Sequence, residues 1–203
     1  TPVAASRSAS AWTGSVAASL VSSRVPVAVA AARTWLDGAP GREAVYLATG
    51  QAWDAEMRQR IQRHQDDRAA RVPGMRTQEA PRALAQALQA CSQPQTLVVV
   101  DCLTLWLTHW MMPMEGVDFG SDQAPAQDWS AQRALFLEVL AACPGPVVVV
   151  GNEIGLGVIP MGREVRAFVD ALGSLNQDVA QVCRHVTLMA AGLPCLLYTS
   201  PSP

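Results

Sequence analysis

The amino-acid sequence predicts an α/β fold in which a mostly parallel sheet carries helices on both faces. Two observations lead to this prediction. Several short runs are apolar throughout and rich in valine, which is typical of strands buried on both faces of a parallel sheet. Segments with helical spacing separate these runs along the chain, as the crossover connections of a parallel sheet require.

The patterned part of the chain begins near residue 44. The run AVYLAT at Ala44–Thr49 predicts a short strand, and the polar stretch at Asp54–Asp67 predicts an exposed helix because Met57 and Ile61 are spaced one turn apart. The same two patterns define the later elements. They are a helix at Glu79–Cys91, a strand at Thr96–Leu103, a helical stretch through Trp106 and Trp110, a loop at Pro113–Asp128, a helix at Trp129–Ala142, a strand at Pro146–Glu153, a helix at Gly162–Arg184 and a strand at His185–Leu193.

Both ends of the chain lack this patterning. Residues 1–35 are rich in Ala, Ser and Val without a helical or strand period, so the segment receives no assigned structure. Residues 195–203 read CLLYTSPSP and break the strand pattern abruptly, which predicts a disordered tail or foreign sequence from a truncated or chimeric reading frame. A single α/β domain is therefore expected over residues 36–194.

Composition excludes several classes of function. The formal net charge of −2 provides no basic field for nucleic acid. No uninterrupted apolar run approaches the roughly 18 residues of a membrane span, and Arg24 and Pro26 interrupt the apolar start that could resemble a signal peptide. The 5 cysteines are scattered singly, which predicts reduced thiols in a cytoplasm, and no cluster has the ligand spacing of a structural zinc site.

The ends of the predicted strands are the first place to look for chemistry. Ligands of open parallel sheets bind at the carboxyl ends of the strands, where this chain has Thr49, Asp101 and Asn152. An acid after four apolar strand residues is the pattern by which P-loop nucleotide enzymes orient Mg²⁺, which makes Asp101 a candidate. The alternative is a strand-end aspartate that caps the following helix.

His64 is the most suggestive of the 3 histidines. It lies in RIQRHQDDR, on the predicted helix after the first strand, with Arg60, Arg63 and Arg68 nearby. An imidazole can attack a phosphoryl or nucleotidyl group, and guanidinium groups offset the charge of the transferred phosphate. The alternative is a solvated helix face. His109 and His185 have apolar neighbours, which favours packing or strand-edge roles.

The ordered motifs resemble one known family. They are YLATGQAWDAEMRQRIQRHQDDR, RTQE, VVVDCLTLWLTHW, VVGNEIGLGVIPMGREVRAFVDALGSLNQDVAQ and AAGLP, which together cover roughly residues 44 to 194. In this order they are similar to the bifunctional adenosylcobinamide kinase/adenosylcobinamide-phosphate guanylyltransferase family of cobalamin biosynthesis. The segments DCLTLW and NEIGLG, with the helix ending in LNQ, are the most specific of them.

This resemblance implies a P-loop NTPase-like, RecA-like fold and two reactions. Members of the family phosphorylate adenosylcobinamide with a nucleoside triphosphate, ATP or GTP. They then transfer GMP from GTP to that phosphate through a GMP-histidine intermediate, which gives adenosyl-GDP-cobinamide. The family also implies Mg²⁺, a cytoplasmic location and a homotrimer.

Site residues follow from the same resemblance. The histidine of the family's RIxxH pattern matches His64 as the catalytic nucleophile, and the acidic strand end near Mg²⁺ matches Asp101. The remaining nucleotide-binding positions are Thr49, Gln51, Gln65, Arg68 and Glu79. Four residues match the distal motif and are assigned only loosely, to structure and a corrinoid-side surface: Asn152, Glu153, Arg163 and Arg166.

The chain departs from the family at its start. Family members begin with a strand and a glycine-rich GGxRSGKS loop whose amides and lysine hold the phosphates, and this sequence contains no lysine. The first strand and this loop are therefore expected to be lost or scrambled, for which a frameshift is one explanation. Two alternatives stay open: a catalytically impaired remnant that binds nucleotide or corrinoid, and another P-loop kinase that shares only the sheet.

Overall fold

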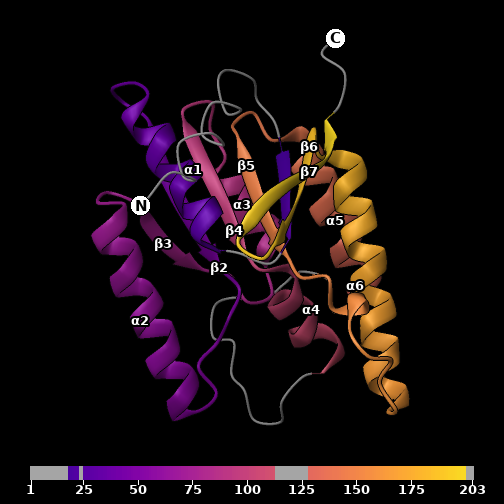
Figure 1. The fold of residues 1–203 in the computed structure, drawn as a ribbon. Helices are drawn as coiled ribbons and strands as arrows, with labels where there is room; N and C mark the ends of the chain where they lie inside the picture. The colour runs from indigo at the N-terminus through magenta and orange to yellow at the C-terminus, as the bar shows by residue number, and fades with distance from the viewer. Residues whose placement is uncertain (1–17, 23–24, 113–127, 200–203) are drawn as a thin grey trace.

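A seven-stranded sheet forms the centre of the molecule in the computed structural model, which describes residues 18–22, 25–112 and 128–199 (Figure 1). Its strand order is β3-β2-β4-β5-β1-β6-β7. Every neighbouring pair is parallel except β6 and β7. The strands are β1 (Ala18–Ser22), β2 (Glu43–Ala48), β3 (Arg76–Glu79), β4 (Thr96–Asp101), β5 (Val147–Gly151), β6 (His185–Ala190) and β7 (Leu193–Thr199). The predicted mostly parallel sheet is confirmed.

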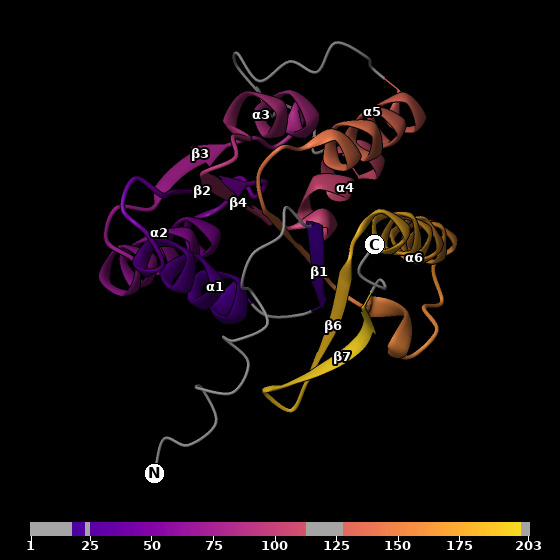
Figure 2. The ribbon, with the colours of Figure 1, turned by 90° about the horizontal axis from the view of Figure 1, so that it is seen from above.

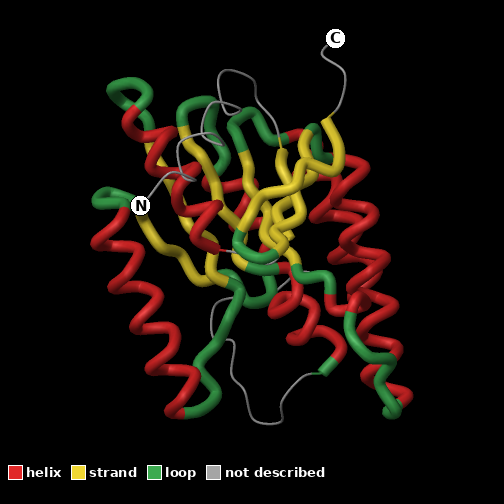
Figure 3. The backbone as a smooth tube through the Cα atoms, viewed as in Figure 1, coloured by secondary structure: helices red, strands yellow, loops and turns green. Residues whose placement is uncertain are grey.

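Helices cover both faces of this sheet, as Figure 2 and Figure 3 show. They are α1 (Val25–Asp37), α2 (Ala55–Arg71), α3 (Leu84–Cys91), α4 (Leu103–Met111), α5 (Trp129–Ala142) and α6 (Arg163–Val182), with a short 3-10 turn at Ile154–Leu156. Side chains of α3, α4, α5 and α6 share one apolar core. A second core on the opposite face contains α1 and Val72, the residue that follows α2.

Alternation along each central strand explains the two cores. In β2, Val45 and Leu47 belong to the first core, whereas Ala44 and Tyr46 belong to the second. Successive strand side chains point to opposite faces, so a strand covered by helices on both sides needs apolar residues at every position. This is the physical reason why the continuous apolar runs predicted their strands correctly.

The expected loss of the first strand is wrong. Residues 18–22 form β1, which lies between β5 and β6 and pairs in parallel with both. Leu20 and Val21 are buried on opposite faces of the sheet. Serines and alanines surround them, so the strand carries too few large apolar residues to stand out by pattern. The predicted boundary at residue 36 also falls inside α1, whose buried side is made mostly of alanines that favour a helix but form a weak apolar pattern.

Two more elements differ from the sequence prediction. The predicted helix at Glu79–Cys91 begins only at Leu84, because residues 76–79 form the edge strand β3 with all 4 side chains exposed. An exposed polar strand has no apolar period to detect, and its pairing with β2 defines it. At the other end, β7 pairs antiparallel with β6 and includes residues 195–199 of the expected tail.

The remaining predictions concern single features. Residues 113–127 of the predicted loop lie outside the described residues, and Asp128 accepts a hydrogen bond from the Ala131 N–H at the start of α5. All 5 cysteines are free thiols. Among the helices described, none is long and apolar enough to cross a membrane.

Candidate active site

One edge of the sheet gathers the polar residues that follow the strands. Because β2, β3, β4 and β5 run parallel, their carboxyl ends meet at the same edge. Ala48 of β2 pairs with Asp101 on one side and with Glu79 on the other. The edge therefore carries Thr49, Glu79, Asp101 and Asn152, as the sequence predicts.

Burial disfavours the charged form of Asp101, and neighbouring groups offset this effect only in part. The Tyr46 hydroxyl donates a hydrogen bond to Asp101 Oδ2. Burial raises the pKa of Asp101 above its ordinary value, while this hydrogen bond and the positive charges of Arg68 and His64 lower it. Burial and the adjacent Asp101 also raise the pKa of Tyr46 far above its ordinary range, so the phenol remains a donor.

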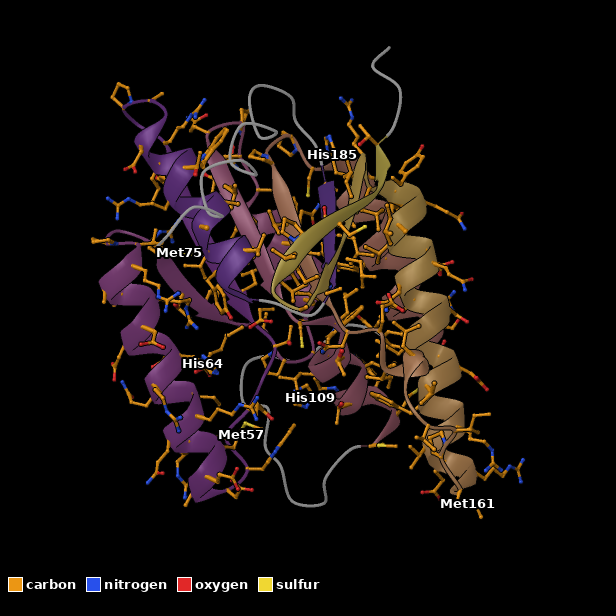
Figure 4. The ribbon with its side chains drawn as sticks, viewed as in Figure 1. Met57, His64, Met75, His109, Met161 and His185 are labelled. Atoms are coloured by element: carbon orange, nitrogen blue, oxygen red, sulfur yellow. The ribbon has the colours of Figure 1, made fainter. Side chains whose placement is uncertain are left out.

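His64 lies on α2, which returns along the sheet after the loop that follows β2. The Asp54 side chain accepts a hydrogen bond from the Met57 N–H and begins this helix. His64 is exposed, and Arg68 follows it by one turn on the same side of the helix. Figure 4 shows His64 beside the carboxyl edge, whereas His185 lies at the opposite edge. The imidazole is therefore accessible to solvent.

Arg68 is the buried cation of the site. Its side chain is 8% exposed, and its guanidinium carbon lies 3.8 Å from the centroid of the Tyr46 ring. Its Nε has no hydrogen-bond partner within the described structure. A buried guanidinium with an unused donor favours an anionic ligand, since a buried donor without an acceptor is costly.

The predicted nucleotide-binding residues are not equally available. Thr49 is buried, and its hydroxyl donates to the Cys102 carbonyl and accepts from the Cys102 N–H, both at 2.8 Å. This hydroxyl therefore joins the ends of β2 and β4. Gln51 and Gln65 are half-buried, and Gln51 Oε1 has no partner among the described atoms. Glu79 is exposed at the end of β3.

His109 contacts the backbone at the end of β2. This buried ring lies 2.7 Å from the Thr49 carbonyl oxygen through Nε2, and it packs edge-on against Trp53 with the ring centroids 5.3 Å apart. The predicted packing role of His109 is confirmed. His185 begins β6, in agreement with the predicted strand-edge role.

Asn176 links the distal motif to the end of β5. Its Nδ2 donates to the Asn152 carbonyl and to Glu153 Oε1, each at 3.0 Å. The Asn152 amide in turn donates to Thr104 Oγ1 at 2.8 Å. A Cβ at position 151 would lie 2.8 Å from Asn176 Oδ1, which explains why glycine ends the strand. The motifs NE and LNQ, distant in the sequence, thus form one hydrogen-bonded unit.

Replacing Asn176 by leucine is expected to lower the free energy of unfolding by about 1–3 kcal/mol, because two half-buried acceptors lose their donor. Urea denaturation followed by circular dichroism measures this. Gln177→Leu is the matched control, since Gln177 is the exposed neighbour on the same helix. If both variants unfold at the same urea concentration, the structural role of Asn176 is refuted.

The two distal arginines lie in the first turn of α6. Arg166 Nη1 donates to the carbonyl oxygens of Pro160 and Met161, at 3.0 and 2.6 Å, and so holds the turn before α6. Arg163 is exposed at the first residue of α6. Both residues therefore lie at the N-terminal end of α6.

Tyr46 is the site residue that sequence reasoning missed. A phenol inside an otherwise aliphatic strand, two positions before the strand end, is the signal that could have identified it. A buried hydroxyl requires a partner. That partner is Asp101, which projects from the neighbouring strand on the same face.

The donor set at Asp101 suits a magnesium ion that arrives with a nucleotide. Mg²⁺ is bound by one or two carboxylates while phosphate oxygens and water complete its shell. Tyr46 bonds to Oδ2 of Asp101, so this hydrogen bond does not occupy Oδ1. Within the described ranges, no group of three or more His, Cys, Asp or Glu side chains could hold a metal by itself.

Comparison with known proteins finds sequences similar to this chain in one family. The sequence profile of the family described as cobinamide kinase/cobinamide phosphate guanyltransferase matches residues 29–197. The bifunctional adenosylcobalamin biosynthesis protein CobP of Pseudomonas aeruginosa is 40% identical over 156 residues, which are 77% of this chain and 83% of that protein. The CobU protein of Escherichia coli, with the same bifunctional description, is 33% identical over 160 residues, 74% of this chain and 83% of that protein.

One further relative and one solved structure are also similar to this chain. The CobU protein of Salmonella typhimurium is 35% identical over 159 residues, which are 74% of this chain and 83% of that protein. Among solved structures, the crystal structure of the RadB recombinase matches with a TM-score of 0.47 and 14% identity, over 92% of this chain and 83% of that one.

Proposed function

Because the chain belongs to the cobinamide kinase/cobinamide phosphate guanyltransferase family, we propose that it phosphorylates adenosylcobinamide and then transfers GMP to the product through His64. The observation that carries this proposal is the arrangement of His64 and Arg68 one turn apart on α2, with Arg68 stacked on the Tyr46 ring whose hydroxyl is bonded to Asp101. A nucleophile, a buried cation and a carboxylate are the groups that nucleotidyl transfer requires.

The kinase step forms an ester at the aminopropanol hydroxyl of the substrate. The hydroxyl oxygen attacks the γ-phosphorus of ATP or GTP, the bond to the bridging oxygen breaks, and the nucleoside diphosphate leaves while the hydroxyl proton passes to solvent. When bound, Mg²⁺ supplies charge neutralisation at the phosphate oxygens. Asp101 would orient that ion.

The transfer step uses His64 twice. A neutral imidazole nitrogen attacks the α-phosphorus of GTP, so that a P–N bond forms and pyrophosphate leaves. A phosphate oxygen of adenosylcobinamide phosphate then attacks the same phosphorus, the P–N bond breaks, and the imidazole is regenerated beside adenosyl-GDP-cobinamide. Arg68, with its unused Nε, would offset the charge on the transferred phosphoryl group.

Radiolabelled GTP tests the proposal. With [α-³²P]GTP the purified chain should acquire an acid-labile, alkali-stable label, and adenosylcobinamide phosphate should remove it as labelled product. With [γ-³²P]GTP the protein itself should stay unlabelled, because pyrophosphate leaves in the first half of the transfer. A protein labelled from the γ position, or from neither, contradicts the proposed function.

We also propose that the chain acts in the cytoplasm as a homotrimer. The free thiols support a reducing compartment. Support for assembly comes from apolar side chains around the turn before α6, which are far more exposed than a monomer favours. They are Leu156 at 79%, Val158 at 95%, Ile159 at 79% and Met161 at 95% exposure.

Placing acids on this turn is expected to disrupt assembly. In Val158→Asp/Met161→Asp, each copy would bury two carboxylates in the interface, which is unfavourable without partners. Sedimentation velocity should show monomers for this variant and trimers for the wild type. Gln181→Asp is the control, as an exposed position farther along α6. A wild-type chain that sediments as a monomer contradicts the proposal.

A further inference from the structure

Helix α2 has very little of its own surface buried. Of its 17 residues, Arg68 alone is buried, and the mean composition of the helix is strongly polar. A helix packed so sparsely derives little stability from an apolar face. Met57, Ile61 and Gln65 are only half-buried, so the enclosed side chain of Arg68 makes the most buried contact of this helix.

The described contacts of α2 lie toward its C-terminal half. Arg68 stacks on the Tyr46 ring at 3.8 Å. Val72, directly after the helix, is buried in the second core, and Arg33 of α1 donates to the Arg71 carbonyl at 3.0 Å. Of these contacts, the Arg68–Tyr46 stack is nearest in the chain to His64, which precedes Arg68 by one helical turn.

We propose that the Tyr46 ring is the seat that positions α2, and with it His64, on the carboxyl edge of the sheet. Tyr46 is 3% exposed and belongs to β2, an inner strand of the sheet, so the place of its ring is fixed by the core. Its hydroxyl is hydrogen-bonded to Asp101, and its ring is enclosed by the second core. The guanidinium of Arg68 rests on the face of this ring, away from water, where a cation–π contact is strongest.

This inference makes Tyr46 a positioning residue that acts through Arg68. Its catalytic consequence rests on the proposed function, whereas the seat, which is the contact between the Tyr46 ring and Arg68, exists in the protein without any ligand. Hydrogen–deuterium exchange of the amides in α2 reports the seat without any ligand. The rate of labelling from [α-³²P]GTP reports its effect on His64.

Three variants separate the ring from the hydroxyl. Tyr46→Phe keeps the ring and removes the hydroxyl. Tyr46→Leu removes the aromatic face, and Arg68→Met removes the cation while leaving β2 and its core intact. We expect amides of residues 58–67 to exchange about tenfold faster in Tyr46→Leu and Arg68→Met, and within about twofold of wild type in Tyr46→Phe.

The labelling rate should fall in Tyr46→Leu and Arg68→Met, the two variants that remove the Arg68–Tyr46 stack. Tyr46→Leu should label more slowly at saturating GTP, because His64 is held less often at the α-phosphorus. Arg68→Met should be slower still, because it also loses the guanidinium that offsets the phosphoryl charge. Equal exchange of α2 in wild type and Arg68→Met would overturn the inference, as would Tyr46→Phe exchanging as fast as Tyr46→Leu. If the wild type never labels while exchange follows the expected order, the proposed function fails and the seat stands.

Discussion

His64→Ala should abolish the label that [α-³²P]GTP leaves on the protein and reduce guanylyl transfer by about 10⁴-fold or more, the scale of losing a covalent nucleophile. Alanine has no atom that can form the P–N bond, and His64 is exposed on α2, so its removal leaves the core unchanged. The kinase step should remain within a few-fold of wild type, since it does not pass through the imidazole.

His185→Ala is the matched control. His185 begins β6 at the edge of the sheet opposite His64, as Figure 4 shows. This variant should label like the wild type. Persistent labelling in His64→Ala, or an equal loss in His185→Ala, would mean that the imidazole of residue 64 is not the nucleophile.

Restoring a glycine-rich loop should produce the second large effect. β1 ends at Ser22 and α1 begins at Val25, and a strand followed by a helix is where P-loop proteins carry this loop. Replacing residues 23–24 by the family's GGxRSGKS sequence adds backbone amides and a lysine for the phosphates. We expect both reactions to accelerate by about 10²-fold or more, since single donors to a transferring group contribute on that scale.

The same graft with alanine in place of its lysine is the control. It keeps the loop length and the glycines, so it should retain only part of the gain. Initial rates of γ-phosphate transfer and of α-label formation measure both. If neither reaction responds to the complete graft, phosphate binding in this chain does not depend on that loop.

Buried parallel strands were predictable because burial on both faces leaves a continuous apolar run, as in Thr96–Asp101 and Val147–Gly151. The strands that escaped prediction carry no such run. β3 is exposed and polar, and β1 has two large apolar residues flanked by small ones. Their places are set by pairing with neighbours, which is information that a local pattern does not contain.

The candidate site was predictable in its members and not in their contacts. Motifs and strand ends identified His64, Arg68 and Asp101. Tyr46 appeared to be one more apolar strand residue, because only the register between β2 and β4 places its hydroxyl against Asp101. In the same way, the contact of Asn176 with Glu153 depends on how α6 packs behind β5. Such contacts follow from the fold, so sequence spacing alone cannot give them.

Locating the covalent GMP on the chain tests the central claim most directly. After incubation with GTP, digestion with trypsin at alkaline pH should cut after Arg63 and Arg68 and release a short peptide that contains His64 as its single histidine. Tandem mass spectrometry should find GMP on that imidazole. GMP on any other residue, or a peptide 64–68 recovered only in its unmodified form, would contradict the account.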